Sequence, residues 1–288
     1  MSFNRTRANN LVSRIEACGN NWQALSNCFK NAGKNTSGSW RKVMLKLQRL
    51  ADCRGSVEAF RVFVKGNSKL PFYSFSTLPV STCPGAGECK QWCYSLKAWR
   101  YPSAFGRQVA NTLLMRFNRS IIIEQFNKLP DNITLRLYVD GDFESSEQVS
   151  FWFSLLKTRP SVSAYGYSKS WDELFEACQI MGELPKNYRL NLSSGGLIRT
   201  ASKNMMESLS ITRGSFIAVR IDPSLMTKTR FALPQYHDAV REAGKELTGK
   251  AIFSCPGKCG ENCNIKNQHA CGNTFAPANG MTIAIGIH

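Results

Sequence analysis

The stretch from Thr134 to Asp142 reads Thr-Leu-Arg-Leu-Tyr-Val-Asp-Gly-Asp, and it decides the fold. Its aliphatic residues occupy alternate positions, which is typical of a β-strand, and an acidic turn follows them. Ser145 with Gln148 then predicts the capped start of a helix that runs to residue 157. A second strand is expected over residues 162–167. Strand, helix and strand in this order predict parallel strands joined by a right-handed crossover.

The same alternation continues over most of the chain beyond residue 70. Further strands are predicted over Phe72–Val80, Arg189–Leu192, Phe216–Ile221, Ala251–Phe253 and Met281–Ile287, and helices over Arg107–Asn127, Trp171–Met181, Lys203–Leu209 and Tyr236–Leu247. Five or six such units are too few for a closed eight-stranded barrel. We therefore expect an α/β fold with a partial (β/α) barrel-like parallel sheet. Hydrophobic residues make up 43% of the 288 residues, which is enough to build a core.

Residues 1–66 are predicted to form a basic helical extension in front of an α/β metal-cluster domain over residues 67–288. Between Met1 and Lys69, thirteen Lys and Arg residues stand against three acidic residues, so ten of the seventeen excess positive charges lie here. We expect this extension to grip phosphates. A helical segment with a solvated basic face is the alternative.

The whole chain has 37 Lys and Arg against 20 Asp and Glu, a formal net charge of +17. Such an excess attracts polyanions and predicts a nucleic-acid partner, DNA or RNA; a protein that is merely basic is the alternative. Residues 1–10 lack the apolar segment of a signal peptide, and no apolar run reaches the ~20 residues that span a bilayer. We expect a cytoplasmic protein of a bacterial host cell with no membrane partner.

Thiol, acidic and small residues follow the predicted strands. In open and closed α/β folds, ligands bind beyond the carboxyl ends of the strands. The site is therefore expected to include Cys83 to Cys93, Asp140-Gly141-Asp142, Ser168-Lys169-Ser170, Ser193-Ser194-Gly195-Gly196, Asp222 and Cys255 to Cys263.

Seven of the 11 cysteines fall in two short windows that also contain glycine and proline. Gly and Pro allow a loop to fold back so that several thiols face one centre. In a reducing cytosol, such clusters indicate metal ligands rather than disulfides. The windows have the spacings C-x5-C-x3-C and C-x3-C-x3-C-x7-C: Cys83, Cys89 and Cys93, then Cys255, Cys259, Cys263 and Cys271.

The two windows favour an iron–sulfur cluster. A set of thiolates with no other ligand can hold such a cluster, whereas zinc, the alternative metal, is usually bound by C-x2-C pairs that neither window contains. Four thiols could close one [4Fe–4S] cluster and three would leave an iron open, which predicts one or two clusters; a single centre shared by both windows is the alternative. His269 could replace one ligand or be a surface residue. The other cysteines are expected in the core: Cys18, Cys28, Cys53 and Cys178.

Several motifs occur together in the second part of the chain. They are Asn67-Ser-Lys-Leu-Pro71, Thr82-Cys-Pro-Gly-Ala-Gly-Glu-Cys89, Cys93-Tyr94, Asp140-Gly-Asp-Phe143, Tyr165-Gly-Tyr-Ser-Lys-Ser170 and the terminal cysteine group. Over about residues 66–288 the chain thus resembles a phage family named for gene product eighty-eight of mycobacteriophages. We expect a phage or plasmid context.

The layout also resembles radical S-adenosylmethionine enzymes, which place a three-cysteine loop after the first strand of a partial barrel and a Gly-Gly-Glu-type motif after the second. Here Cys83 to Tyr94 stands in the first place and Asp140 to Asp142 in the second, although the usual cysteine spacing is C-x3-C-x2-C. The resemblance implies a [4Fe–4S] cluster on the first window whose open iron binds S-adenosylmethionine. It also implies an auxiliary cluster on the second window.

This first hypothesis gives catalytic roles to Asp140, Asp142 and Lys169, and cofactor contacts to Tyr94, Gly141, Ser193, Ser194 and Gly195. A carboxylate accepts hydrogen bonds from amino and ribose groups. Structural alternatives are a helix start for the two aspartates, a solvated strand end for the lysine and a tight turn for the glycines.

The second hypothesis is a non-catalytic or replication-type DNA-binding protein in which metal centres staple a basic scaffold. A nicking variant of it would use Tyr94 or Tyr101 as the nucleophile. The chain has only three His residues, so no paired-His metal motif supports nicking.

Overall fold

A computed structural model describes residues 5–67, 70–91, 93–197, 199–257, 259, 264–265, 268–272 and 280–287. Its centre is an eight-stranded sheet in the order β1-β2-β3-β4-β5-β6-β10-β7. The strands are β1 Val64–Asn67, β2 Leu70–Ser74, β3 Ile133–Leu137, β4 Val162–Ser168, β5 Tyr188–Ser193, β6 Thr212–Arg220, β7 Ile252–Ser254 and β10 Thr282–Ile287. A separate antiparallel pair is formed by β8 Asn264–Ile265 and β9 Gln268–His269.

Six of the seven pairings in the large sheet are parallel, and only β1 pairs with β2 in the antiparallel sense. The sheet does not close on itself within the described residues. The predicted α/β class with a partial, barrel-like parallel sheet is therefore confirmed.

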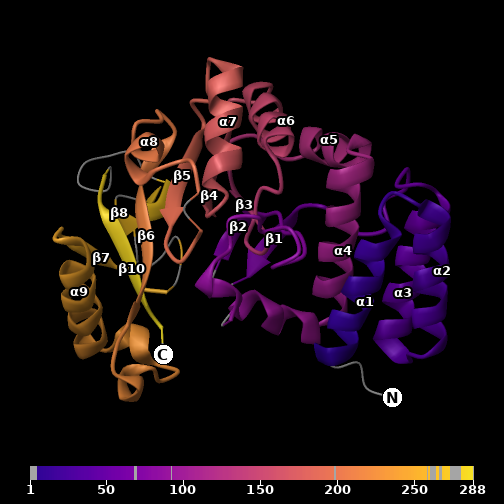
Figure 1. Cartoon of the computed structure of the whole chain (residues 1–288), viewed down its shortest axis with the longest axis horizontal. Helices are drawn as coiled ribbons and strands as arrows, with labels where there is room; N and C mark the ends of the chain where they lie inside the picture. The colour runs from indigo at the N-terminus through magenta and orange to yellow at the C-terminus, as the bar shows by residue number, and fades with distance from the viewer. Residues whose placement is uncertain are drawn as a thin grey trace.

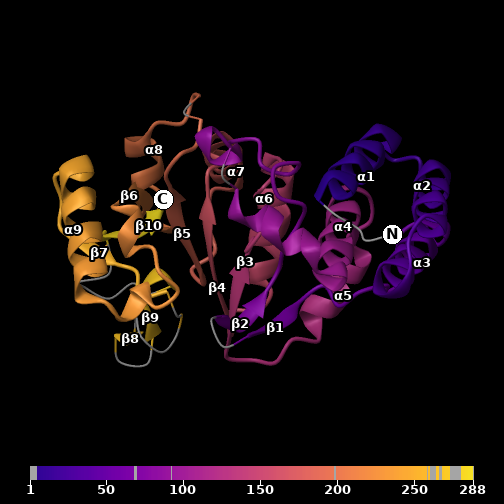
Figure 2. The same cartoon turned by 90° about the horizontal axis from the view of Figure 1, so that it is seen from below.

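Helices surround the sheet and extend it at both ends. They are α1 Arg5–Cys18, α2 Trp22–Lys34, α3 Gly38–Asp52, α4 Pro102–Phe117, α5 Ser120–Asn127, α6 Ser146–Lys157, α7 Trp171–Met181, α8 Lys203–Glu207 and α9 Pro234–Thr248. Helices α5 to α8 lie outside the curve of the sheet (Figure 1). The N-terminal helices and α9 occupy opposite ends of the molecule (Figure 2).

The two faces of the sheet carry different side chains. Leu135, Ala164 and Leu190 point into the main core under the helices. Positions offset by one residue face the inner side, because side chains alternate along a strand. A separate inner cluster is built from Tyr165, Ala270, Cys271 and Ile283, with Phe72, Tyr167, Phe216, Phe253 and Cys255 packed against it.

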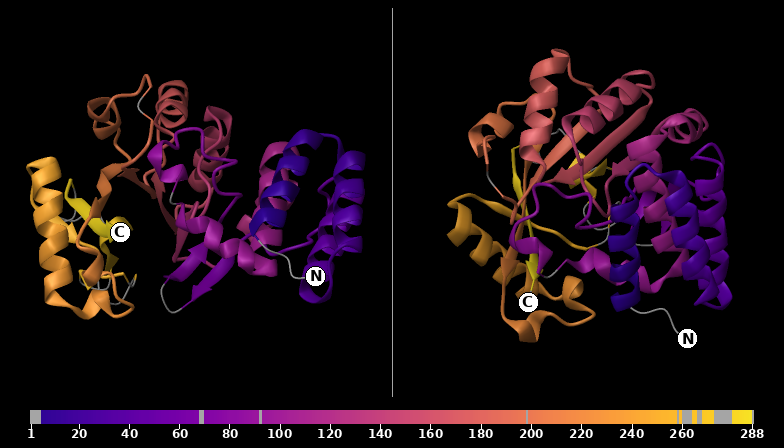
Figure 3. Two further views of the ribbon diagram at one scale, coloured as in Figure 1. Left: turned by 60° about the horizontal axis from the view of Figure 1, so that its bottom comes forward. Right: turned by 45° about the vertical axis from the view of Figure 1, so that its right-hand side comes forward.

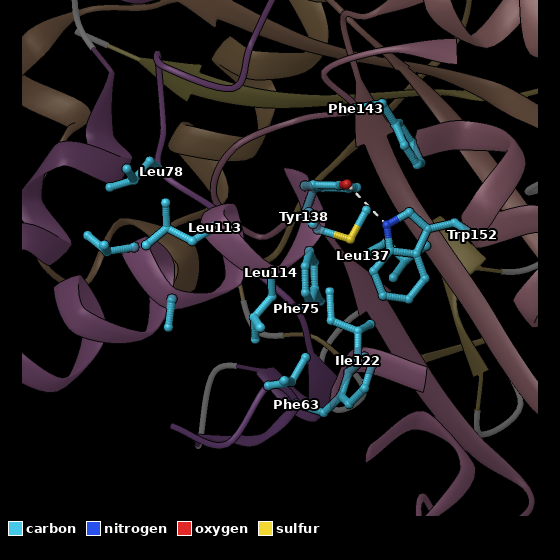
Figure 4. Packing of buried hydrophobic residues seen from close by; sticks show 14 of the residues in the cluster. Phe63, Phe75, Leu78, Leu113, Leu114, Ile122, Leu137, Tyr138, Phe143 and Trp152 are labelled. Atoms are coloured by element: carbon cyan, nitrogen blue, oxygen red, sulfur yellow. Dashed lines mark hydrogen bonds between the residues drawn. The ribbon is translucent and has the colours of Figure 1, made fainter. Parts of the chain in front are cut away.

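The main core is continuous from the N-terminal helices to the sheet. Trp152 on α6 packs against Phe75 with ring centroids 4.8 Å apart, and its indole N–H donates to the hydroxyl of Tyr138 at 3.1 Å (Figure 4). The same cluster includes Phe29 of α2 and Leu47 of α3. Helices α1 to α3 lie beside α4 in both views of Figure 3. The predicted boundary between an extension and a domain at residue 66 stays a prediction.

Local sequence explains most element ends. The Ser145 hydroxyl accepts from the Gln148 amide at 3.3 Å, which confirms the predicted start of α6. The strand predicted over Phe72–Val80 is β2, which begins earlier, at Leu70, and ends earlier, at Ser74, although the amides of Phe75 and Thr77 still donate to the carbonyls of Arg136 and Asp140. The predicted helix over Arg107–Asn127 is two helices, α4 and α5, separated at Asn118 and Arg119.

The last strand, β10, has an unexpected place. It lies between β6 and β7 and is parallel to both.

Among the helices that the structure describes, none has the length and apolar character needed to cross a membrane.

Candidate functional site

The first cysteine loop, residues 83–93, is fastened to the segment that follows β5. The Gly85 carbonyl accepts from the Leu197 amide at 2.8 Å, and the Gly87 amide donates to the Gly195 carbonyl at 3.3 Å. These two backbone hydrogen bonds flank an isolated antiparallel β-bridge between Ala86 and Gly196. The loop therefore lies across the carboxyl ends of the central strands.

Two glycines let the loop approach the ends of β3 and β4. A Cβ atom on Gly85 would lie 1.8 Å from the Lys169 carbonyl oxygen, so no larger residue fits there. Gly141 has φ +78°, and a Cβ on it would lie 2.0 Å from Thr77 Oγ1. Only glycine can leave this space free at position 85 and adopt this positive φ at position 141 without strain. The first cysteine loop, the acidic turn after β3 and Lys169 thus form one layer.

The three thiols of the loop lie within electrostatic reach of one another. Burial, and then the Asp142 carboxylate, raise the pKa of Cys83, and the thiols of Cys93 and Cys89 raise it further. Burial also raises the pKa of Cys89, while the Lys169 ammonium lowers it in part. Within the described part of the chain, no three His, Cys, Asp or Glu side chains form a group that could hold a metal ion.

Asp142 ties the ends of β3 and β4 together. One carboxylate oxygen accepts from the Phe143 amide at 2.8 Å and the Ser168 hydroxyl at 2.6 Å. The other accepts from the Lys169 amide at 2.8 Å. Asp142 is only 5% exposed, and burial raises its pKa. This geometry makes Asp142 a positioning residue; a direct catalytic role for it stays a prediction.

The Lys169 side chain reaches the end of the next strand. Its Nζ donates to the Ser193 hydroxyl at 2.6 Å. The Lys169 ammonium and the Ser193 hydroxyl therefore form a hydrogen-bonded pair beside the first cysteine loop. Gly85 of this loop packs against the Lys169 backbone. Such a pair can donate to a carboxylate or phosphate.

Asp140 supports the other side of the loop. It accepts from Gln108 Nε2 at 2.9 Å, and Gln108 in turn accepts from the Trp99 indole at 2.9 Å. A hydrogen bond from Ser95, two residues after Cys93, also reaches it. Burial raises the pKa of Asp140, although these bonds lower it in part. Asp140 thus anchors the 3₁₀ helix Tyr94–Arg100 that leaves the loop.

The predicted cofactor contacts divide into two groups. Gly141, Ser193 and Gly195 lie next to the first cysteine loop, as the contacts above describe. The Ser194 hydroxyl instead accepts from the Ala218 amide at 2.9 Å, so it joins β5 to β6. Tyr94 is 58% exposed and is an electrostatic neighbour of Arg136.

Of the C-terminal cysteine group (Cys255, Cys259, Cys263 and Cys271), Cys255 and Cys271 pack in the inner cluster on the sheet. Cys263 is outside the described residues, as is the side chain of His269. Burial raises the pKa of Cys271 to about 12, and its neighbours include the Cys255 and Cys259 thiols. The Cys271 carbonyl accepts from Asn191 Nδ2 at 2.9 Å.

Cys255 directly follows β7, as the sequence predicts, but β7 ends at a lower level in the sheet than β6 does. Ser254 of β7 and Ile217 of β6 both pair with Ala284 of β10, so they lie at the same height in the sheet. Ile217 is three residues before the end of β6. Because β7 is short and pairs with the first half of β10, Cys255 begins beside the sheet and not beyond it. Of the four cysteines predicted in the core, Cys28 and Cys178 are buried, and Cys18 and Cys53 are partly buried.

Arg136 is the functional candidate that the sequence pattern did not single out. Its guanidinium lies 4.7 Å from the ring centroid of Tyr167 on the inner face, and its neighbours include Tyr94 and Cys259. Its buried Nε has no hydrogen-bond partner among the described residues. An arginine within an alternating apolar strand was the available signal. Arg136 is thus near Tyr94, which follows the first cysteine loop, and near Cys259 of the C-terminal cysteine group.

Comparison with known proteins gives one match. A family model described as "Gene product 88" matches residues 47–229, which is more than half of the chain and includes the first cysteine loop. No curated protein matches the chain. No solved structure matches it either.

Proposed function

The chain belongs to the Gene product 88 family, and we propose that it is an iron–sulfur protein with radical S-adenosylmethionine-like chemistry acting on or near nucleic acid. Cys83, Cys89 and Cys93 would hold a [4Fe–4S] cluster with one iron left for S-adenosylmethionine. A single observation carries the proposal. Three neighbouring thiols sit on one loop fastened over the carboxyl ends of parallel strands, where α/β sheets bind their ligands.

The three thiols of the first cysteine loop are chemically suitable ligands for an iron–sulfur cluster. Iron–sulfur clusters are held by thiolates, and the loop offers three of them beside glycines that permit a tight backbone. The proposal requires the side chains of Cys89 and Cys93 to turn toward Cys83, since the three do not form a metal-binding group as they stand. It also requires their protons to leave, because only the thiolate is a ligand.

The bound cluster and cofactor would supply the radical chemistry, and the protein the geometry. Asp142 fixes the Lys169 backbone, so the ammonium is held beside Ser193. This pair would bind an anionic group of the cofactor or substrate. Arg136 offers a second cation on the inner face, between the two sets of cysteines. Asp140 would keep the exit of the first cysteine loop in place through Gln108.

The C-terminal cysteine group would hold a second cluster. Cys255, Cys259 and Cys271 are electrostatic neighbours, and Cys263 lies in the same window of the sequence. Four thiolates leave no iron open, which suits an auxiliary or structural centre.

Release of 5′-deoxyadenosine tests the enzyme directly. Anaerobically purified full chain is reduced with dithionite in the presence of S-adenosylmethionine, and the product is quantified. We expect release by wild type and by Cys18→Ser, whose cysteine belongs to neither window, and none by Cys83→Ser. No release from wild type that carries its full iron and sulfide would remove the enzymatic part of the proposal.

One observation favours the second candidate, a non-catalytic or replication-type DNA-binding protein with structural metal centres. Cys271 is 7% exposed and packs among Tyr165, Ala270 and Ile283, as expected of a closed structural site. Zinc would suit such a site. The nicking version would use Tyr94 or Tyr101, which are 58% and 56% exposed. Covalent attachment of either tyrosine to a cleaved DNA end would support it.

A further inference from the structure

A basic groove lies between α3, residues 60–64 and the start of α4. Its volume is about 510 Å3. The residues that matter for the argument are Lys42, Lys46, Phe60, Arg61, Ser103 and Arg107. None of them belongs to the site described above.

Close backbone packing forms the floor of the groove. A Cβ on Gly106 would lie 2.7 Å from the Phe60 ring and 2.6 Å from Val43 Cγ1, so the glycine lets both side chains rest on α4. The rings of Trp40 and Phe105 also pack together nearby, tilted by 60° with their centroids 5.6 Å apart. The groove is therefore a fixed feature of the fold and not a gap between loose loops.

Four cations line this groove without an acidic partner. Among the described residues, none of Lys42, Lys46, Arg61 and Arg107 forms an ion pair. The Lys46 ammonium instead lies 5.4 Å from the centroid of the Phe60 ring. Burial lowers the pKa of Arg107. Cations collected in this way repel one another unless an anion joins them.

The groove adjoins the layer that carries the first cysteine loop. Arg107 faces the groove, while its neighbour Gln108 donates to Asp140. The 3₁₀ helix Tyr94–Arg100 connects the loop to α4 and exposes Lys97 and Arg100. Positive charge therefore continues from the groove toward the loop.

We propose that this groove binds the phosphate backbone of a single-stranded nucleic acid and leads the strand toward the first cysteine loop. The proposal rests on the nucleic-acid partner of the proposed function. Single strands are held by positively charged grooves that track the backbone, with aromatic residues beside them. Four unpaired cations around Phe60 meet this description. A duplex needs a broader surface than a groove of this size offers.

Fluorescence anisotropy with a labelled oligothymidylate of about 20 nucleotides, longer than one such site, tests the proposal. The groove variant Lys42→Gln/Lys46→Gln/Arg61→Gln changes three exposed side chains. The control Lys228→Gln/Lys245→Gln/Lys250→Gln removes the same charge near α9, at the opposite end of the molecule. We expect the groove variant to bind at least about tenfold more weakly, and the slope of log affinity against log salt concentration to fall by about two, since each of three lost cations contributes roughly 0.7 on a single strand. The control is expected to bind within about twofold of wild type.

Equal loss of affinity in the two variants would overturn the proposal, as would the absence of binding by wild type. Stronger binding of a duplex of the same length, unaffected by the groove variant, would overturn it as well. Iron, sulfide and 5′-deoxyadenosine are measured on the same preparations. A full cluster without oligonucleotide binding removes this inference and leaves the iron–sulfur part of the proposed function standing, whereas groove-dependent binding by an iron-free protein supports the inference and removes the iron–sulfur part of the proposed function.

Discussion

The Asp142 carboxylate joins two strand ends by accepting three hydrogen bonds from Phe143, Ser168 and Lys169. In Asp142→Asn, one oxygen becomes an amide that faces N–H or O–H donors. A buried donor without an acceptor costs about 1–3 kcal/mol. We expect the free energy of unfolding at neutral pH to fall by about that amount, measured by urea titration. Glu183→Gln, which alters an exposed carboxylate, is the control; equal stability of the two variants would contradict this role.

The pH dependence of stability gives a second prediction for this carboxyl. Burial raises its pKa, so the folded chain holds a proton that the unfolded chain has already released. A raised pKa contributes stability that is complete below the unfolded value of about 3.9 and is lost as the pH rises through the folded value. The advantage of wild type over Asp142→Asn should therefore shrink as the pH rises. An advantage that grows with pH in the same urea titrations would argue against it.

At the scale of elements, the first cysteine loop depends on the space at Gly85. In Gly85→Ala the new methyl group would meet the Lys169 carbonyl, which is backbone and cannot turn away. We expect the amides of Gly87 and Leu197 to exchange with solvent at least about tenfold faster, because their bonds fasten the loop. Hydrogen exchange read by mass spectrometry measures this change.

Gly33→Ala is the matched control for this loop variant. Its added Cβ meets Met44 at an ordinary 3.4 Å, and it lies within α2. It should leave exchange in the loop unchanged. Unaltered exchange in Gly85→Ala would show that the loop does not depend on this contact.

Elements with a strong local signal were predicted well. Helix α7 has the predicted bounds, and the Ser145 cap is present. The insertion of β10 between β6 and β7 could not be predicted, since it depends on pairing between segments far apart in the chain. The break between α4 and α5 has a local cause, because the Asn118 side-chain oxygen accepts from the Ser120 amide at 3.2 Å and competes with the helical hydrogen bonds.

At the scale of the whole molecule, one core joins the N-terminal helices to the sheet. Phe29 on α2 is fully buried in it. Phe29→Ala should therefore lower the free energy of unfolding by about 3–5 kcal/mol. Far-ultraviolet circular dichroism and tryptophan fluorescence should report a single shifted transition. Leu45→Ala, at a residue 55% exposed on α3, should change stability by less than about 0.5 kcal/mol.

Two separate transitions in Phe29→Ala would contradict a shared core. They would support an N-terminal extension that folds apart from the rest of the chain, as the charge distribution alone suggests.

The sequence predicted which residues belong to the site but not how they are arranged in space. Cysteine spacing and the rule about strand ends indicated Cys83, Asp142 and Lys169, and the structure brings these three together. The bonds between the first cysteine loop and the segment after β5 depend on tertiary folding. The strand pattern did not reveal the role of Arg136. Alternation shows on which face of the sheet a side chain lies, but not which residues of other segments it contacts there.

In the proposed function, the clustered thiolates hold iron. Metal and sulfide analysis of the full chain, purified without oxygen, tests it most directly. We predict about four iron and four sulfide per cluster, with a loss of iron in Cys83→Ser and none in Cys18→Ser. Stoichiometric zinc without iron, or no bound metal at all, would contradict the account.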